Sequence, residues 1–136
     1  MLIFPEFTIP YNRSKIRYKI LWKTKNKDIF ESMFYGHTWK MNKEYHCPIS
    51  KLFYNVGFHV FVTLEDAISV LEEYTLRRQL TDMDDNKPND LVIVKVEVDD
   101  FKVRGFNSEF TEIAEEVWMK CKIVSVVQNK NTTCPP

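Results

Sequence analysis

The stretch Gly57-Phe58-His59-Val60-Phe61-Val62-Thr63-Leu64-Glu65-Asp66-Ala67 predicts a strand that runs directly into a helix. Its first part, residues 58–62, is a compact run of residues that favour β structure. Thr63 then suits the N-cap of a helix. Asp66 would occupy the third helical position, where an acidic side chain stabilises the helix dipole. The stretch therefore predicts a strand and a helix with no loop between them.

The helix that follows Thr63 is predicted over about residues 64–80. Its apolar residues recur at helical spacing and form one stripe, made of Leu64, Ala67, Val70, Leu71 and Tyr74. Arg77 and Arg78 close the last turn, where positive charge complements the helix dipole. We expect the apolar stripe to pack against a sheet.

Strands are predicted on both sides of this helix, over residues 16–22, 29–35, 91–98 and 115–127. In the first, Ile16, Tyr18, Ile20 and Trp22 share one face, and Arg17, Lys19 and Leu21 share the other, which we expect to face solvent. In the third, Val92, Val94, Val96 and Val98 share a face, and Asp99-Asp100 is predicted to end the strand. Residues 38–47 are predicted to be irregular, residues 81–89 a loop, and residues 101–114 a long connection.

This order of elements indicates the α+β class, with one main helix on a curved, mostly antiparallel sheet. The length of 136 residues suits a single domain over 1–136. Residues 1–14, with two prolines, are predicted to form an extended arm. Residues 128–136 are predicted to form a flexible tail.

The composition indicates a globular protein, with 44% hydrophobic and 28% charged residues. The three cysteines, Cys47, Cys121 and Cys134, match neither a disulfide framework nor a zinc spacing, so we predict no metal site. No signal peptide or membrane span is visible in the sequence. We therefore expect a soluble protein of the cytoplasm, with reduced thiols and no membrane partner.

The charges are divided unevenly along the chain. Residues 1–60 contain ten Lys or Arg and four Asp or Glu, a net charge of +6, whereas residues 61–136 contain nine and fifteen, a net charge of −6. Such a division is consistent with a face that binds polyanions, and equally with two halves that attract each other.

His59 is the main candidate for a functional residue, because a neutral imidazole on a strand can hydrogen-bond a ligand or act as a general base. The alternative is a core histidine that donates to a backbone carbonyl. Tyr35 and Trp39 are candidates for stacking on a base, and Arg17 and Lys19 for contacting phosphates. Glu115 and Glu116 precede the last strand, where paired acids can orient a sugar hydroxyl, although they also suit a solvated edge.

Several segments together resemble a family of small proteins of phages and large DNA viruses. These are Arg17-Tyr18-Lys19-Ile20-Leu21, then Gly57-Phe58-His59-Val60-Phe61 with Thr63 and Asp66-Ala67, then residues 92–98, then Lys120-Cys121-Lys122-Ile123-Val124. The resemblance covers roughly residues 16–127, and it implies a viral accessory protein.

The order of these segments also resembles the ADP-ribosyltransferase fold, which implies NAD as a ligand. In that resemblance Arg17, Thr63 and either Glu115 or Glu116 would fall at functional positions, and His59, Glu115 and Glu116 are the candidate catalytic residues. Two features of the pattern are missing, a Ser-Thr-Ser-like triplet at 61–63 and a Glu-x-Glu pair. Because Glu115 and Glu116 are adjacent, a strand would direct them to opposite faces.

The leading hypothesis is a viral accessory domain that binds a host protein or a nucleotide-like ligand in the host cytoplasm, without a cofactor. The first alternative is an NAD-dependent enzyme of the ADP-ribosyltransferase type. The second is a nucleic-acid-binding protein, whose affinity would fall steeply with salt.

Overall fold

The computed structural model describes residues 15–33, 37–47, 56–81, 90–107, 109–110 and 112–127, with the backbone alone for 78–81. The elements follow the order β1 (Lys15–Lys23), β2 (Ile29–Ser32), β3 (Thr38–Lys40), β4 (Glu44–His46), β5 (Phe58–Phe61), α1 (Leu64–Thr81), β6 (Leu91–Phe106) and β7 (Ala114–Val126). The sheet is antiparallel, so the predicted α+β class with one main helix is confirmed.

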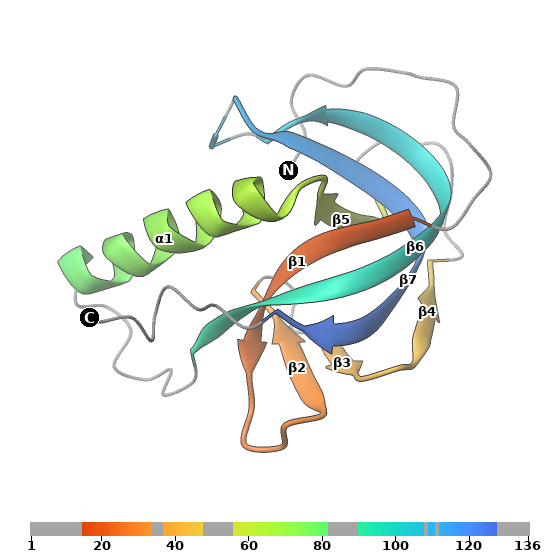
Figure 1. Ribbon diagram of the computed structural model, residues 1–136, viewed down its shortest axis with the longest axis horizontal. Coiled ribbons are helices and arrows are strands. Elements are labelled where there is room, and N and C mark those ends of the chain that lie inside the picture. Colours follow the sequence, from red (N-terminus) through yellow and green to blue (C-terminus); the bar gives the residue numbers. More distant parts are fainter. Residues whose placement is uncertain are drawn as a thin grey trace.

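Four of the strands close into a ring. Strand β1 pairs with both β5 and β6, and β7 also pairs with both β5 and β6. Strands β2 and β3 extend the sheet from β1, and β4 pairs with β7. Figure 1 shows how strongly β6 and β7 bend as they follow this ring, with α1 along one side of it. The sheet therefore has an inner face, inside the ring, and an outer face.

The inner face of the ring holds the larger hydrophobic core. Its buried residues come from six strands: Leu21, Phe30, Trp39, Val60, Val94, Val96, Val98, Trp118, Cys121 and Ile123. The valines that alternate along β6 share one face, as predicted, and this face points inward, where Val94, Val96 and Val98 are fully buried. Burial of each such side chain stabilises the fold by about 1.5–3 kcal/mol.

Helix α1 covers the outer face through the predicted apolar stripe. Ala67 and Val70 are completely buried against Ile20, Trp22 and Ile93 of β1 and β6. The predicted cap is confirmed, since the Thr63 hydroxyl accepts a hydrogen bond from the Asp66 backbone N–H at 3.1 Å. The core is therefore formed on both sides of the sheet.

Gly57 allows β5 to lie against β7. Its φ of 141° is a conformation that other residues rarely adopt. A Cβ atom there would lie 2.6 Å from Cγ1 of Val117 and 3.0 Å from the backbone oxygen of Trp118. Glycine is therefore required at position 57, immediately before β5.

Two strand predictions were wrong in their bounds, and one region was wrongly predicted to be irregular. The strand predicted over 29–35 ends at Ser32, and the region predicted to be irregular contains the short strands β3 and β4. Strand β6 does not end at Asp99-Asp100 but continues to Phe106, with an irregular register between Phe101 and Val103. Asp100 has a φ of 61°, which aspartate tolerates better than most residues, so the chain bends there without leaving the sheet.

Some predictions concern residues outside the described part of the chain. These are the arm over 1–14, the tail over 128–136, residues 82–89 of the predicted loop, and Tyr35. Within the described residues, no helix is both long and apolar enough to cross a membrane.

Candidate functional site

A cavity of about 530 Å³ opens where β1 and β5 diverge. These two strands pair at a single residue pair, Tyr18 with Phe61, and the residues beyond it on both strands line the cavity. The lining includes Lys19, Ile20 and Leu21 of β1, residues 57–61, Ser32, Met33, His37, Trp39, Tyr74 of α1, and Asn107, Glu109 and Glu115. The volume lies within the range of small-molecule sites.

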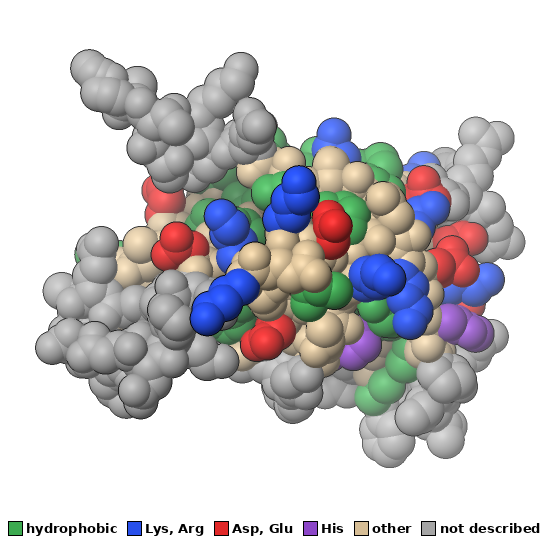
Figure 2. All heavy atoms as spheres, turned by 90° about the horizontal axis from the view of Figure 1, so that it is seen from below, with side chains coloured by type: hydrophobic (Ala, Val, Ile, Leu, Met, Phe, Trp, Pro, Cys, Tyr) green, Lys and Arg blue, Asp and Glu red, His purple; other side chains and the backbone are tan. Residues whose placement is uncertain are grey.

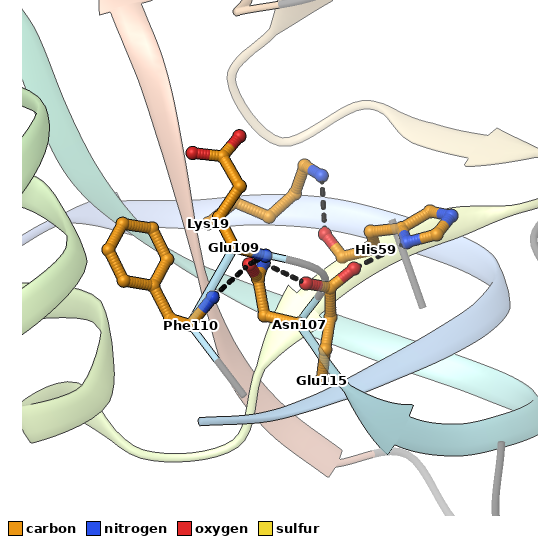
Figure 3. Close-up of polar contacts among 6 residues, drawn as sticks. All are labelled: Lys19, His59, Asn107, Glu109, Phe110 and Glu115. Atoms are coloured by element: carbon orange, nitrogen blue, oxygen red, sulfur yellow. Dashed lines mark hydrogen bonds and ion pairs between the residues drawn. The ribbon is translucent and has the colours of Figure 1, made fainter. Parts of the chain in front are cut away.

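Three polar side chains that line the cavity, His59, Asn107 and Glu115, lie close together and come from three different segments (Figure 3). The His59 Nδ1 atom lies 2.6 Å from Glu115 Oε1, and the Asn107 amide Nδ2 donates to Glu115 Oε2 at 2.6 Å. The Glu115 side chain is only 4% exposed, whereas that of His59 is 27% exposed. His59 is therefore the more accessible member of the pair, and Glu115 lies behind it.

The Glu115 carboxylate is stabilised in its charged form despite this burial. Burial alone would raise its pKa, but the hydrogen bond and the charge of His59, together with the hydrogen bond from Asn107, lower the pKa below its usual value. An ionised carboxylate only accepts hydrogen bonds, so Nδ1 of His59 carries the proton between them.

Lys19 brings a cation to the same cavity. Its Nζ atom donates to the backbone oxygen of His59 at 2.6 Å, across the gap between β1 and β5, and lies 5.5 Å from the centre of the Trp39 ring. Burial lowers the pKa of Lys19, and the nearby Glu115 carboxylate opposes this shift. Lys19 therefore joins the two strands at the point where their own pairing stops.

Two other ionisable side chains line the cavity and are held in their neutral forms. Burial, with help from Glu109 and Glu115, raises the pKa of Tyr74 to about 12. Burial and the charge of Lys19 lower the pKa of His37. At neutral pH the phenol and this imidazole can therefore offer hydrogen bonds without adding charge.

Glu116 points to the opposite face of the sheet from Glu115, as predicted from their adjacency. Arg17 Nε donates to Glu116 Oε1 at 2.6 Å, and Trp118 Nε1 donates to the same oxygen at 2.9 Å. Neither Arg17 nor Glu116 is among the residues that line the cavity. Of the two glutamates, Glu115 alone is brought together with His59.

The prediction that Arg17, Lys19 and Leu21 face solvent was wrong. This side of β1 is the inner face of the ring, where Leu21 is 1% exposed and the guanidinium of Arg17 lies over the Trp118 ring at 5.9 Å. The alternation itself was read correctly. The error arose because the closed sheet and α1 bury both faces of β1 over residues 20–22. A charged side chain on the inner face then needs partners that a linear sequence does not reveal.

The other predicted binding residues have mixed positions. Trp39 lines the cavity but is 2% exposed and packs edge-on against Phe58 and Tyr45. Thr63 does not line the cavity, and its hydroxyl caps α1.

Several cavity residues were not predicted from the sequence, namely Met33, Tyr74, Asn107 and Glu109. Tyr74 lies in the predicted apolar stripe of α1 and also lines the cavity. Asn107 and Glu109 belong to the segment predicted to be a featureless connection. The spacing of Asn107 ahead of Glu115 carries no recognised motif, so nothing in the sequence distinguished it.

The uneven charge of the two halves of the sequence does not produce a uniformly basic surface on the face drawn in Figure 2. In the face shown in Figure 2, Lys and Arg side chains are interspersed with Asp and Glu side chains. The Arg17–Glu116 ion pair joins the basic half of the chain to the acidic half. Within the described residues, no group of three or more His, Cys, Asp or Glu side chains could hold a metal ion.

Comparisons with known proteins leave the cavity as the main evidence on function. No protein-family model, curated protein or solved structure matches this chain.

Proposed function

We propose that this protein is a viral accessory domain that binds a small nucleotide-like ligand in the cavity between β1 and β5. The observation that carries the proposal is the combination, in one cavity, of aromatic side chains with the hydrogen-bonded group His59, Asn107 and Glu115. A heterocyclic base can pack against aromatic rings, and a ribose brings hydroxyl groups that hydrogen-bond carboxylates and imidazoles. The viral context comes from the sequence resemblance alone.

A small ligand is favoured over a host protein because the candidate residues surround a cavity instead of an exposed patch. Phe58, Phe61 and Tyr74 are half-buried, and their rings line the space together with Met33. A host protein remains the expected partner if no small ligand binds.

The test is thermal-shift screening followed by calorimetry with nucleosides, nucleotides, cyclic nucleotides and NAD. A ligand at a hundred times its Kd should stabilise the fold by about 2.7 kcal/mol. His59→Ala should abolish most of this stabilisation. His46→Ala is the matched control, because His46 is exposed on β4 and does not line the cavity. Absence of binding by every ligand, or equal binding by both variants, would overturn the proposal.

A second candidate, cleavage of NAD by an enzyme of the ADP-ribosyltransferase type, is favoured by one specific observation. Lys19, His59 and Glu115, from an early strand, the strand before the helix and the last strand, line the same cavity. In such a reaction the buried carboxylate would stabilise a sugar that becomes cationic as its bond to nicotinamide breaks. This candidate relies on Glu115, because Glu116 is paired with Arg17 on the other face.

The second candidate predicts release of nicotinamide from NAD, and loss of this release in Glu115→Gln. His46→Ala should retain the activity. If NAD stays intact during a long incubation at high protein concentration, the second candidate is removed and the binding proposal is unaffected.

The basic side chains of β1 that were expected to bind nucleic acid do not form a solvent-facing surface. Arg17 and Lys19 lie on the inner face, where they pair with Glu116 and with the His59 backbone. We therefore rank this alternative below both others, and salt-insensitive or absent binding to a nucleic acid would eliminate it.

A further inference from the structure

The turn between β6 and β7 begins at Asn107, and this side chain is bonded on both of its amide atoms. Its Nδ2 donates to Glu115 Oε2, and its Oδ1 accepts from the backbone N–H groups of Glu109 at 2.8 Å and Phe110 at 3.1 Å. Its own backbone N–H donates to the oxygen of Ile113 at 2.9 Å. Asn107 is 6% exposed, so these bonds form away from water.

The orientation of the Asn107 amide follows from these partners. Two N–H donors require an oxygen on one side, and a carboxylate requires an N–H donor on the other. A flipped amide would place oxygen against oxygen and N–H against N–H. The turn therefore determines which amide atom faces Glu115, as Figure 3 shows.

Side chains of helix α1 contact this β6–β7 turn. Arg77 donates to Glu109 at 2.6 Å and lies over the Phe110 ring at 5.2 Å, while Tyr74 packs edge-on against the same ring. The Arg77–Glu109 ion pair joins two exposed side chains, so it adds little stability by itself. Together these contacts position the turn relative to the helix that forms one side of the cavity.

We propose that Asn107 is a positioning residue, which holds the Glu115 carboxylate in the orientation that aligns His59 with the cavity. Glu115 Oε1 lies at hydrogen-bond distance from His59 Nδ1, and Asn107 Nδ2 donates to the other carboxylate oxygen, Oε2. Loss of this bond would remove the donor to Oε2, which is one of the contacts that set the orientation of the carboxylate toward the imidazole. The importance of this alignment for ligands rests on the proposed binding function.

Asn107→Asp is the sharpest test, because it keeps the size and the oxygen that accepts from the turn. It replaces the N–H donor with an oxygen that faces Glu115 at hydrogen-bond distance. Two carboxylates this close share a proton, so we expect the pKa of Glu115 to rise. We also expect the His59 ring to lose its preference for the tautomer with the proton on Nδ1.

The measurements are NMR titration of the glutamate carboxyl carbons and long-range proton–nitrogen spectra of the histidine rings, on protein without ligand. Asn107→Ser, which keeps an acceptor for the turn and shortens the reach to Glu115, should give a smaller change in the same direction. Glu112→Gln is the control, since Glu112 is exposed in the same turn and should leave both signals unchanged.

An unchanged Glu115 pKa and an unchanged His59 tautomer in folded Asn107→Asp would overturn the proposal and leave Asn107 as a turn residue only. Because these signals are read without ligand, that outcome differs from failure of the binding function. If a ligand is found, Asn107→Asp should weaken its binding at least tenfold at neutral pH, and Glu112→Gln should not weaken it.

Discussion

Glu115 and Glu116 are neighbours in the chain but lie in two different environments. Both are buried, at 3% and 5% exposure. Glu116, on the inner face, is balanced by the guanidinium of Arg17. Glu115, at the cavity, is balanced by His59 and by the neutral amide of Asn107. The inner pair therefore balances a charge inside the ring, whereas the outer pair lines the cavity.

The largest expected effect comes from removing the cation on the inner face. Arg17→Met leaves Glu116 buried without its partner and should lower the free energy of unfolding by roughly 2–4 kcal/mol. Denaturant unfolding at neutral pH measures this change. Arg104→Met is a suitable control, because Arg104 lies opposite Glu116 in the register but is bonded to none of its side-chain atoms among the described contacts. An equal loss in both variants would contradict a specific role for the Arg17–Glu116 pair.

Gly57→Ala should disturb the cavity side and leave the inner ion pair in place. The added Cβ would meet Val117 at 2.6 Å, in a backbone conformation unfavourable for alanine. We expect a loss of about 2 kcal/mol, together with altered His59 NMR signals. Stability equal to that of the native chain would show that β5 can move away from β7 without cost.

Thr63→Ala tests whether Thr63 belongs to the cavity or to the helix. Loss of the cap should lower stability by about 1 kcal/mol, and ligand affinity should not change. Thermal unfolding and calorimetry on the same variant separate the two roles. A selective loss of affinity at unchanged stability would restore Thr63 as a binding residue.

The smallest expected effect is on how the free energy of unfolding changes at acidic pH. The folded-state pKa of Glu115 is lowered, so its contribution to stability is fully present above the unfolded value of about 4.3. That contribution is lost as the pH falls through the lower folded-state pKa. Glu115→Gln should therefore show a shallower decline of stability with acid than the native chain. Parallel acid profiles would mean that Glu115 adds no pH dependence.

The sequence predicted the parts of the fold that depend on local patterns. The Thr63 cap, the apolar stripe of α1 and the valines of β6 follow from spacing alone, and all three are confirmed. The continuation of β6 beyond Asp99-Asp100 could not be read, because two adjacent aspartates usually end a strand. Here the chain bends at Asp100 and pairs with β7 on both sides of the bend.

The site was predicted only in part, for a related reason. His59 and Glu115 were selected by residue type, and Lys19 as one of several basic residues. Their convergence depends on ring closure, which joins β1, β5 and β7 from distant parts of the chain. No sequence pattern identified Asn107, because its role depends on hydrogen bonds across the β6–β7 turn. The sequence does not reveal these bonds.

The closed ring also has a consequence for how the chain folds. Strands β6 and β7 are separated by a short turn, whereas Trp22 must find Leu91, and Lys15 must find Val98, across most of the chain. Local pairing involves the smaller loss of chain entropy, so we expect the β6–β7 hairpin to form early and β1 to dock late. In folding kinetics, Val117→Ala should then slow folding, and Leu21→Ala should mainly speed unfolding. The reverse pattern would indicate that ring closure comes first.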